Sequence, residues 1–377
     1  MEITVKTLYG LEDVVAGELG ALGIEGVEKG NRAVTFEGGR EQLYGANYML
    51  RSALSILVKV GGFYISSRDD LYRGALKIDW SSLMSENDTF SVTPVVNSPL
   101  FQHTAYPGLV VKDAIADHFR TRSGRRPSVN SAHPRISVNL HISNKEATLS
   151  VDSSVLPLFK RGYRKLQAGA PLNESLAAGI IMLTGWRGDS DFYDPMCGSG
   201  TFPIEAGLIA AAIPPGFKRD FYGFMNWRDY DSHLFMKVRE RYNRRIRPVT
   251  VKIGGSDISM RAVRAARDGV IKAGLEGDVR INREDFSAPF NVNRSGIVLF
   301  NPPYGKRIVP DELELFYKST GRVLKHHYVG CDVWILSGAA AAMKHLGLRP
   351  SSRQKLYNGS IECTLNNYKV MEGSFRK

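Results

Sequence analysis

The sequence predicts an α/β protein in which a doubly wound sheet with a terminal antiparallel hairpin follows two smaller α+β units. Three observations support this fold class. From residue 171 onward, short apolar strands alternate with helical segments. Within that region, residues 191–212 are typical of a strand end, a tight glycine turn and a helix. Near residues 353–370, two strand-like runs flank Asn358-Gly359, a strong signal for a two-residue hairpin turn.

The doubly wound sheet is expected to occupy the C-terminal region. Its strands are predicted near residues 190–194, 249–253, 278–282, 296–300 and 331–337. Ligands of such sheets bind beyond the carboxyl ends of the strands. The glycine turn and a second unusual motif each follow one of these strands. We therefore expect the two motifs to converge on one site.

The N-terminal region alternates strands and helices over shorter distances. In residues 1–62, we expect strands at 3–7, 34–36 and 55–60 and helices at 11–22 and 41–53. In residues 63–155, we expect strands at 89–96, 136–142 and 146–152 and helices at 69–78 and from Pro107 onward. Residues 156–170 are expected to form a basic linker.

Composition narrows the class of partner. The formal net charge is +12, which favours a polyanionic partner such as nucleic acid. The three cysteines, Cys197, Cys331 and Cys363, form no C-x-x-C pair, so we expect neither a metal site nor a disulfide framework. The N-terminus does not resemble a signal peptide, and the apolar, uncharged stretch at residues 175–186 is too short to span a bilayer. These features predict a cytoplasmic protein with no membrane partner.

The pentapeptide Asn301-Pro302-Pro303-Tyr304-Gly305 follows a buried strand and is the most informative motif of the chain. Its prolines lack N–H donors, so carbonyl groups there can point away from a strand ladder. The Asn301 side-chain oxygen and the Pro302 carbonyl can then accept two hydrogen bonds from one –NH2 group. Tyr304 can stack on the flat ring that carries this group. The motif therefore indicates a clamp for the exocyclic amine of a nucleobase.

A glycine turn, Asp194-Pro195-Met196-Cys197-Gly198-Ser199-Gly200-Thr201, follows the first predicted strand of the sheet. It is not the dinucleotide fingerprint, because Pro203 stands where the third glycine would fall. It also lacks the Gly-Lys-Ser/Thr ending of a P-loop. This disfavours a nicotinamide-dependent oxidoreductase, while the turn still fits a nucleotide-binding α/β unit.

These two motifs together resemble the S-adenosylmethionine-dependent RNA methyltransferases that contain a THUMP domain, and among them the branch that methylates guanine N2 in large-subunit ribosomal RNA. Further similar stretches lie at residues 107–115, 160–164, 170–174 and 356–359. The resemblance implies a Rossmann-like class I methyltransferase domain at residues 171–377. It also implies a THUMP RNA-binding domain at 63–155, and we expect a ferredoxin-like domain at 1–62.

The resemblance implies S-adenosylmethionine as cofactor and gives roles to three acidic residues. Asp194 is expected to hold the glycine turn or to accept from the methionine amino group. Asp257 is expected to accept from both ribose hydroxyls, and Asp285 from the adenine amine. The full set of expected cofactor residues is Asp194, Pro195, Cys197, Gly198, Ser199, Gly200, Thr201, Asp257, Ile258, Asp285, Phe286 and Asn301.

The expected catalytic residues are Asn301, Pro302, Pro303 and Tyr304. The exocyclic amine is a poor nucleophile because its lone pair is delocalised into the ring. Two fixed acceptors would orient and polarise it toward the methyl group, which is catalysis by positioning and electrostatics. The target base is expected to leave its stack before it reacts.

Contacts with RNA are expected from basic residues. The expected residues are Lys112, Arg122, Arg125, Arg126, Lys160, Arg161, Arg164, Arg244 and Arg245. Tyr163 is available for base stacking in the linker. The stretch between Asp194 and Asp257 is about three times the usual ~20 residues. We hypothesise that this extra segment forms a helical wall over the active site and contacts RNA.

Several functions remain compatible with the residues. Guanine-N2 methylation of 23S ribosomal RNA is the first hypothesis, and the same reaction on transfer RNA is an alternative. The Asn-Pro-Pro-Tyr clamp serves any exocyclic amine, so N6-adenine methylation of RNA or DNA is another. A non-catalytic RNA-binding assembly factor is a third class, disfavoured by the intact Asp194, Gly198, Gly200, Asp257 and Asn301.

Overall fold

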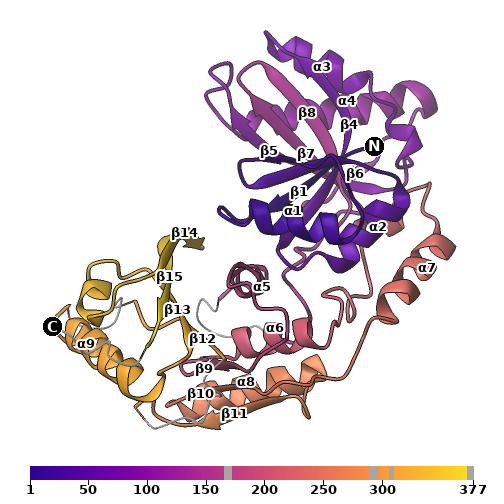
Figure 1. Cartoon of the computed structure of the whole chain (residues 1–377). Coiled ribbons are helices and arrows are strands. Elements are labelled where there is room, and N and C mark those ends of the chain that lie inside the picture. Colours follow the sequence, from indigo (N-terminus) through magenta and orange to yellow (C-terminus); the bar gives the residue numbers. More distant parts are fainter. Residues whose placement is uncertain (165–171, 288–295, 305–309, 372–377) are drawn as a thin grey trace. The chain divides into compact units, whose positions relative to one another are not determined.

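The computed structural model describes residues 1–164, 172–287, 296–304 and 310–371. It divides into two compact units, each assembled from separate stretches of the chain (Figure 1). The N-terminal unit comprises Met1–Thr7, Val15–Leu158 and Arg219–Arg241, and the α/β unit comprises Leu8–Val14, Phe159–Lys218 and Tyr242–Lys377. Gly305 of the pentapeptide and residues 165–170 of the predicted linker lie outside the described residues.

One sheet of eight strands forms the N-terminal unit, in the order β2-β3-β1-β4-β8-β7-β5-β6. The strands are β1 Glu2–Thr7, β2 Glu28–Gly30, β3 Ala33–Glu37, β4 Ala53–Tyr64, β5 Thr89–Asn97, β6 Ser128–Val129, β7 Ile136–Ser143 and β8 Glu146–Asp152. The long strand β4 pairs with β1 through its first half and with β8 through its second half. The two units predicted from the sequence therefore share one sheet, and the predicted boundary after residue 62 falls inside β4.

Helices connect successive strands of this sheet along the chain. They are α1 Glu12–Ala21, α2 Arg40–Met49, α3 Arg68–Leu76 and α4 Tyr106–Ser123, with the 3-10 turn η1 Trp80–Ser82. Helix α2 ends earlier than the predicted residue 53, because Leu50 is already extended and Ala53 begins β4. Helix α4 ends at Gly124, whose φ of 71° suits a residue without a Cβ atom.

A segment from the middle of the chain completes the N-terminal unit. Residues 219–241 contain η2 Gly223–Asn226 and most of α7 Ser232–Asn243. Their aromatic rings Phe224 and Phe235 pack against Tyr44 of α2, with ring centroids 4.5 and 5.6 Å from it. Arg40 of α2 also pairs with Asp229 at 2.8 Å. Residues 219–241 of the segment expected to form a helical wall thus belong to the N-terminal unit, where their aromatic side chains are buried.

The α/β unit contains a sheet of seven strands in the order β11-β10-β9-β12-β13-β15-β14. The strands are β9 Phe192–Asp194, β10 Ile253–Asp257, β11 Val279–Arg283, β12 Ile297–Phe300, β13 Asp332–Ser337, β14 Ser352–Asn358 and β15 Ile361–Lys369. Strands β9 to β13 run parallel, while β15 is antiparallel to both of its neighbours. The predicted doubly wound sheet with a terminal hairpin is confirmed.

Strand β10 starts four residues later than predicted, at Ile253 in place of residue 249. It includes the glycine pair Gly254-Gly255, which lies just beyond the predicted strand. A Cβ atom on Gly255 would lie 2.8 Å from Pro203 and 2.9 Å from Cys197. Glycine is therefore needed inside this strand so that the turn after β9 can lie against it.

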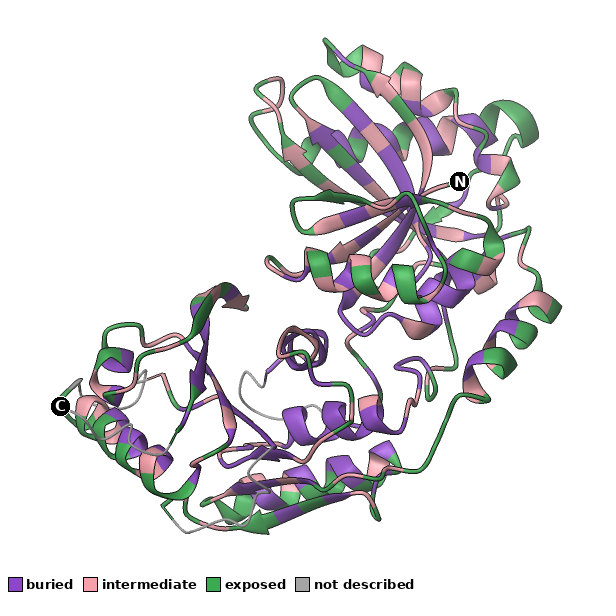
Figure 2. Ribbon diagram, in the orientation of Figure 1, coloured by how far each residue is buried: buried purple, intermediate pink, exposed green. Residues whose placement is uncertain are grey.

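Helices cover both faces of this sheet. They are α5 Glu174–Leu183, α6 Thr201–Ala210, α8 Met260–Ala273 and α9 Pro310–His327, with the 3-10 turn η3 Ala342–Leu346. Helices α5 and α6 are buried along most of their length (Figure 2). Leu11, from the short N-terminal stretch of this unit, reaches the same core, where its side chain leaves no room for a Cβ atom on Gly179. No helix within the described residues is both long and apolar enough to cross a membrane.

Candidate active site

The two motifs of the α/β unit lie at the carboxyl ends of adjacent parallel strands. Val298 of β12 is in register with Tyr193 of β9, so Asp194 and Asn301 both emerge at the same edge of the sheet. On the other side of β9, Asp194 is in register with Gly255 of β10, which places Asp257 at that edge as well. The structure therefore brings the residues expected from the sequence to one edge, at the point where the strand order reverses.

The glycine turn after β9 requires glycine at two positions. Gly198 and Gly200 have φ values of 54° and 79°, in the left-handed region that other residues rarely adopt. A Cβ atom on Gly200 would also lie 2.8 Å from Ala266 of α8. The turn is fixed to the neighbouring strand, because the Cys197 N–H donates to the Ser256 carbonyl at 2.8 Å. This geometry leads directly into α6 at Thr201.

Asp194 is buried at the end of β9. Its carboxylate accepts a hydrogen bond from the Met196 N–H at 3.0 Å. Burial, reinforced by the nearby charge of Asp257, raises the pKa of Asp194 well above its ordinary value. Among the described residues, no cation forms an ion pair with it. A cationic group of a ligand would therefore find an uncompensated carboxylate here.

Asp257 connects the second strand of the site to the glycine turn. One carboxylate oxygen accepts from the Gly198 N–H at 3.0 Å, and the other accepts from the Ser259 N–H at 2.9 Å. Carboxylate oxygens have further lone pairs, so both can still accept from a ligand hydroxyl. The next residue, Ile258, is 63% exposed. These features fit the predicted cofactor roles, which stay predictions.

Asp285 and Phe286 follow β11 and are arranged differently from each other. Asp285 is exposed, and hydrogen bonds from the Ser287 hydroxyl and N–H lower the pKa of its carboxyl group. The ring of Phe286 packs on Phe300 and Tyr328, with centroids 5.5 and 5.7 Å apart. The adenine contacts expected from this pair also stay predictions.

A pocket of about 510 Å³ opens at the end of β12. It contains all the predicted catalytic residues. Its lining consists of Leu8, Asn173, Leu176, Asn301, Pro302, Pro303, Tyr304, Tyr357, Asn358, Gly359 and Ile361. The contributions from α5 and from the β14–β15 turn were not among the predicted site residues. Their stretches, 170–174 and 356–359, were nevertheless among those that carry the family resemblance.

Inside this pocket, Asn301 and Tyr304 contact each other. The Tyr304 hydroxyl donates a hydrogen bond to Asn301 Oδ1, the atom expected to accept from the target amine. Burial raises the pKa of Tyr304, so the hydroxyl keeps its proton. An incoming amine must therefore share Oδ1 with this hydroxyl or displace it. The stacking role of the Tyr304 ring stays a prediction.

Comparison with known proteins identifies the family. A model of the RMKL-like methyltransferase domain matches residues 161–367, more than half of the chain. The chain belongs to the RMKL-like methyltransferase family. Models of the RlmL ferredoxin-like domain and of the THUMP domain match residues 2–57 and 66–152. The predicted family and fold class are confirmed.

Individual relatives agree with this assignment. The ribosomal RNA large subunit methyltransferase K/L of Syntrophotalea carbinolica is 36% identical over 97% of this chain and 53% of its own length, so the chain spans about half of that protein. A putative RNA methyltransferase of a Synechocystis species is 35% identical over 96% of this chain and 94% of its own length. A solved structure of a putative methyltransferase complexed with SAH is 29% identical, with a TM-score of 0.89 and 98% coverage of both chains.

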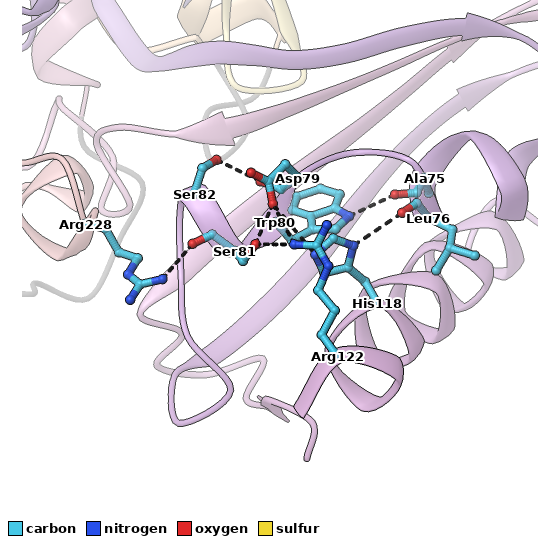
Figure 3. A network of polar contacts seen from close by, with 9 residues as sticks. All are labelled: Ala75, Leu76, Asp79, Trp80, Ser81, Ser82, His118, Arg122 and Arg228. Atoms are coloured by element: carbon cyan, nitrogen blue, oxygen red, sulfur yellow. Dashed lines mark hydrogen bonds and ion pairs between the residues drawn. The ribbon is translucent and has the colours of Figure 1, made fainter. Parts of the chain in front are cut away.

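In this RMKL-like methyltransferase, part of the predicted RNA-contact set is exposed. Arg125, Arg126, Lys160, Arg244 and Arg245 are exposed and Lys112 is partly buried. Arg122 is exposed but already paired within the N-terminal unit. Figure 3 shows its guanidinium between Asp79 and the Ser81 hydroxyl, at 3.1 and 2.7 Å. Arg228, from the 219–241 segment, donates to the Ser81 carbonyl at 2.8 Å in the same network.

Two residues expected to contact RNA are instead part of the methyltransferase core. Arg161 is 5% exposed, and its guanidinium lies 3.6 Å from the carboxylate of Glu205, which is fully buried on α6. Tyr163 is 3% exposed and donates to the same carboxylate at 2.9 Å. The predictions of RNA contact for Arg161 and stacking for Tyr163 are wrong, because both side chains are buried in the α/β unit and contact the carboxylate of Glu205. Arg164 is partly buried and pairs with Glu174 at 3.5 Å.

A test of the buried carboxylate follows from its pKa. Because folding raises the pKa of Asp194, the native protein binds this proton more tightly than the unfolded chain does. The group therefore costs no stability below the ordinary carboxyl pKa, and it lowers the free energy of unfolding as the pH rises above that value. We therefore expect Asp194→Asn to raise the midpoint of thermal unfolding at pH 7, with a difference that shrinks toward acidic pH. Affinity for S-adenosylmethionine should fall about tenfold or more, since a charged hydrogen bond contributes about 1.5–3 kcal/mol.

Calorimetric unfolding between pH 4 and 8, with cofactor titration on the same samples, measures both effects. Asp285→Asn is a matched control for the unfolding measurement alone, because Asp285 is exposed and its pKa is lowered instead of raised, so its replacement should not stabilise the protein at pH 7. An Asp194→Asn protein that is less stable than wild type at pH 7 would contradict the assignment of an uncompensated buried charge.

Proposed function

We propose that this methyltransferase transfers the methyl group of S-adenosylmethionine to the exocyclic N2 of a guanine in 23S ribosomal RNA. The observation that carries the proposal is the placement of Asn301 and Pro302 at the end of β12, next to Asp194 at the end of β9. An amine-binding pocket and a candidate site for a cationic cofactor thus share one edge of the α/β sheet.

The cofactor side of this edge offers complementary chemistry. Asp194 supplies a buried carboxylate for the methionine ammonium, and Asp257 supplies acceptors for the ribose. The exposed Ile258 offers an apolar surface for adenine. The relative solved with SAH supports this choice of cofactor. In the reaction, the guanine N2 lone pair attacks the sulfonium methyl carbon, the S–CH3 bond breaks, S-adenosylhomocysteine leaves, and one amine proton passes to solvent.

The acceptor side explains how a weak nucleophile reacts. Asn301 Oδ1 and the Pro302 carbonyl accept hydrogen bonds from the amine and turn its lone pair toward the methyl group. Preorganised polar groups of this kind contribute because they need no rearrangement during the reaction. The Tyr304 hydroxyl, which now occupies Oδ1, would move to share or release this atom when the base enters.

The choice of RNA rests on the N-terminal unit and on the relatives. The THUMP match at residues 66–152 and the net charge of +12 favour RNA over other substrates. The relative in Syntrophotalea carbinolica is named for the large ribosomal subunit, which favours ribosomal over transfer RNA.

Nucleoside analysis tests the proposal. Purified protein is incubated with tritiated S-adenosylmethionine and with large-subunit ribosomal RNA transcribed in vitro, which carries no modification. We expect label in N2-methylguanosine. A transfer RNA transcript serves as the parallel substrate. Label only in transfer RNA, or in N6-methyladenosine, would overturn the proposed substrate. No label from a protein that binds cofactor would support a non-catalytic RNA-binding role.

A further inference from the structure

A second cavity of the α/β unit, of about 530 Å³, lies between η3 and the β14–β15 hairpin. Its polar lining is basic and neutral, and no lining residue is acidic. The lining residues that matter here are Lys344 of η3, Arg349 in the following loop, Arg353 of β14, and Thr364 and Asn366 of β15. We refer to this cavity as the basic pocket.

The cations of the basic pocket are available to a ligand. Lys344, Arg349 and Arg353 are exposed, and within the described residues none of them forms an ion pair with a carboxylate. Like charges that line one cavity repel each other, so their arrangement is unfavourable until an anion enters. Exposed guanidinium groups match the oxygens of a phosphate especially well, because they donate from a planar fork.

Asn366 supplies an independent indication that a ligand binds here. Its side chain is 5% exposed, lines the basic pocket, and has an Oδ1 atom without a hydrogen-bond partner. The Asn366 amide N–H donates to the Tyr368 hydroxyl oxygen, which leaves Oδ1 as the atom without a partner. A half-turn of the amide would let Oδ1 accept from the Tyr368 hydroxyl and direct Nδ2 as a donor into the pocket. With the amide so turned, Nδ2 would be the group that an anion pairs with, and Oδ1 would be satisfied by the Tyr368 hydroxyl.

The basic pocket and the Asn301 pocket are joined by one strand. Arg353 in the basic pocket and Tyr357 in the Asn301 pocket both belong to β14. They are four residues apart, which corresponds to about 13 Å along a strand, and they face the same side of the sheet. A phosphate in the basic pocket would therefore lie within reach of the RNA strand whose base enters the Asn301 pocket.

We propose that the basic pocket binds a phosphate group of the RNA strand that carries the target base. This proposal rests on the proposed function, since it assigns a contact to the same substrate. The phosphate contact fixes the strand on the α/β unit itself, so that the extruded base is presented to Asn301. Phosphate contacts position a nucleic acid without reading its sequence.

Single charge reversals test the contact. We expect Arg349→Glu and Arg353→Glu each to raise KM for the unmodified large-subunit transcript about tenfold and to lower the slope of log Kd against log salt by about one. The matched control is Arg264→Glu on the exposed side of α8, for which we expect KM within about twofold of wild type. Affinity for S-adenosylmethionine should stay at the wild-type value in all three, which also shows that they are folded.

The outcomes separate this proposal from the proposed function. If wild type methylates the transcript and the pocket variants behave like Arg264→Glu, the basic pocket does not bind the substrate, whereas the methyltransferase activity stands. If wild type methylates no RNA, the proposed function fails and the RNA contact fails with it. Titration with inorganic phosphate, followed by ³¹P NMR, identifies a third case: phosphate binding that Arg353→Glu removes, with an unchanged KM for RNA, would assign the pocket to a free anion. Lys344→Glu repeats the test if either arginine variant fails to fold.

Discussion

Replacement of Asn301 by alanine is expected to lower kcat by about 10²–10³, with a smaller loss of affinity for S-adenosylmethionine because Asn301 is also one of the expected cofactor residues. The loss follows from the removal of one of two acceptors that orient the amine, an effect typical of a single preorganised polar group. Asn301 stands at the end of β12, and its Oδ1 atom takes part in a hydrogen bond with Tyr304 in the free protein. Single-turnover transfer of tritiated methyl to the transcript, with cofactor binding measured separately, gives both quantities.

Two Tyr304 variants serve as matched controls for this pocket. Tyr304→Phe removes only the hydroxyl that occupies Oδ1, so the ring remains and most of kcat should persist. Tyr304→Ala removes the ring and should weaken base binding by about 1–3 kcal/mol, which appears mainly in KM. An Asn301→Ala protein with wild-type kcat would show that the amine is held elsewhere, and the role of the pentapeptide would have to be abandoned.

The second large effect is expected in stability, at Glu205. This fully buried carboxylate accepts from the Tyr163 hydroxyl and faces the Arg161 guanidinium, which is itself buried. Glu205→Ala leaves a buried cation without its carboxylate partner, a change that usually costs about 3–5 kcal/mol. We therefore expect a marked fall in the free energy of unfolding and in the midpoint of urea denaturation.

Two further variants isolate the cause of this loss. Glu205→Gln keeps an acceptor for Tyr163 but removes the charge, so its effect should lie between wild type and Glu205→Ala. Glu314→Gln weakens the exposed contacts with Lys318 and His345 and should change the free energy of unfolding by about 1 kcal/mol or less. If Glu205→Ala unfolds at the wild-type urea concentration, the remaining contacts of Arg161 are sufficient to hold its charge.

The core of the site could be predicted from the sequence because its signals are local. Asp194 and Asn301 each follow a short apolar strand, and the rule that ligands bind at strand ends then predicts that they converge. Gly198 and Gly200 likewise predict a turn, and both residues have positive φ in the structure. The strand predicted at 249–253 starts four residues before β10, whose Gly255 serves the close approach of Pro203 and Cys197, a contact that the sequence alone does not display.

The remainder of the site depends on contacts between distant segments, which a single sequence does not display. Arg161 and Tyr163 look like an exposed basic and aromatic stretch until Glu205 is placed beside them. Asn358 reads as a turn residue, and only the fold brings it to the Asn301 pocket. The sequence shows that Phe224 and Phe235 are apolar, but it does not show that they pack against Tyr44, which lies far away in the chain.

Neither unit corresponds to a continuous piece of the gene. A fragment ending at residue 158 would lack residues 219–241 and leave Tyr44 uncovered, while one beginning at residue 159 would lack Leu11 from its core. An exchange of the N-terminal unit between relatives would therefore have to carry several separate coding segments at once. Because each unit is assembled from separate stretches of the chain, laboratory chimaeras need junctions on both sides of the 219–241 segment.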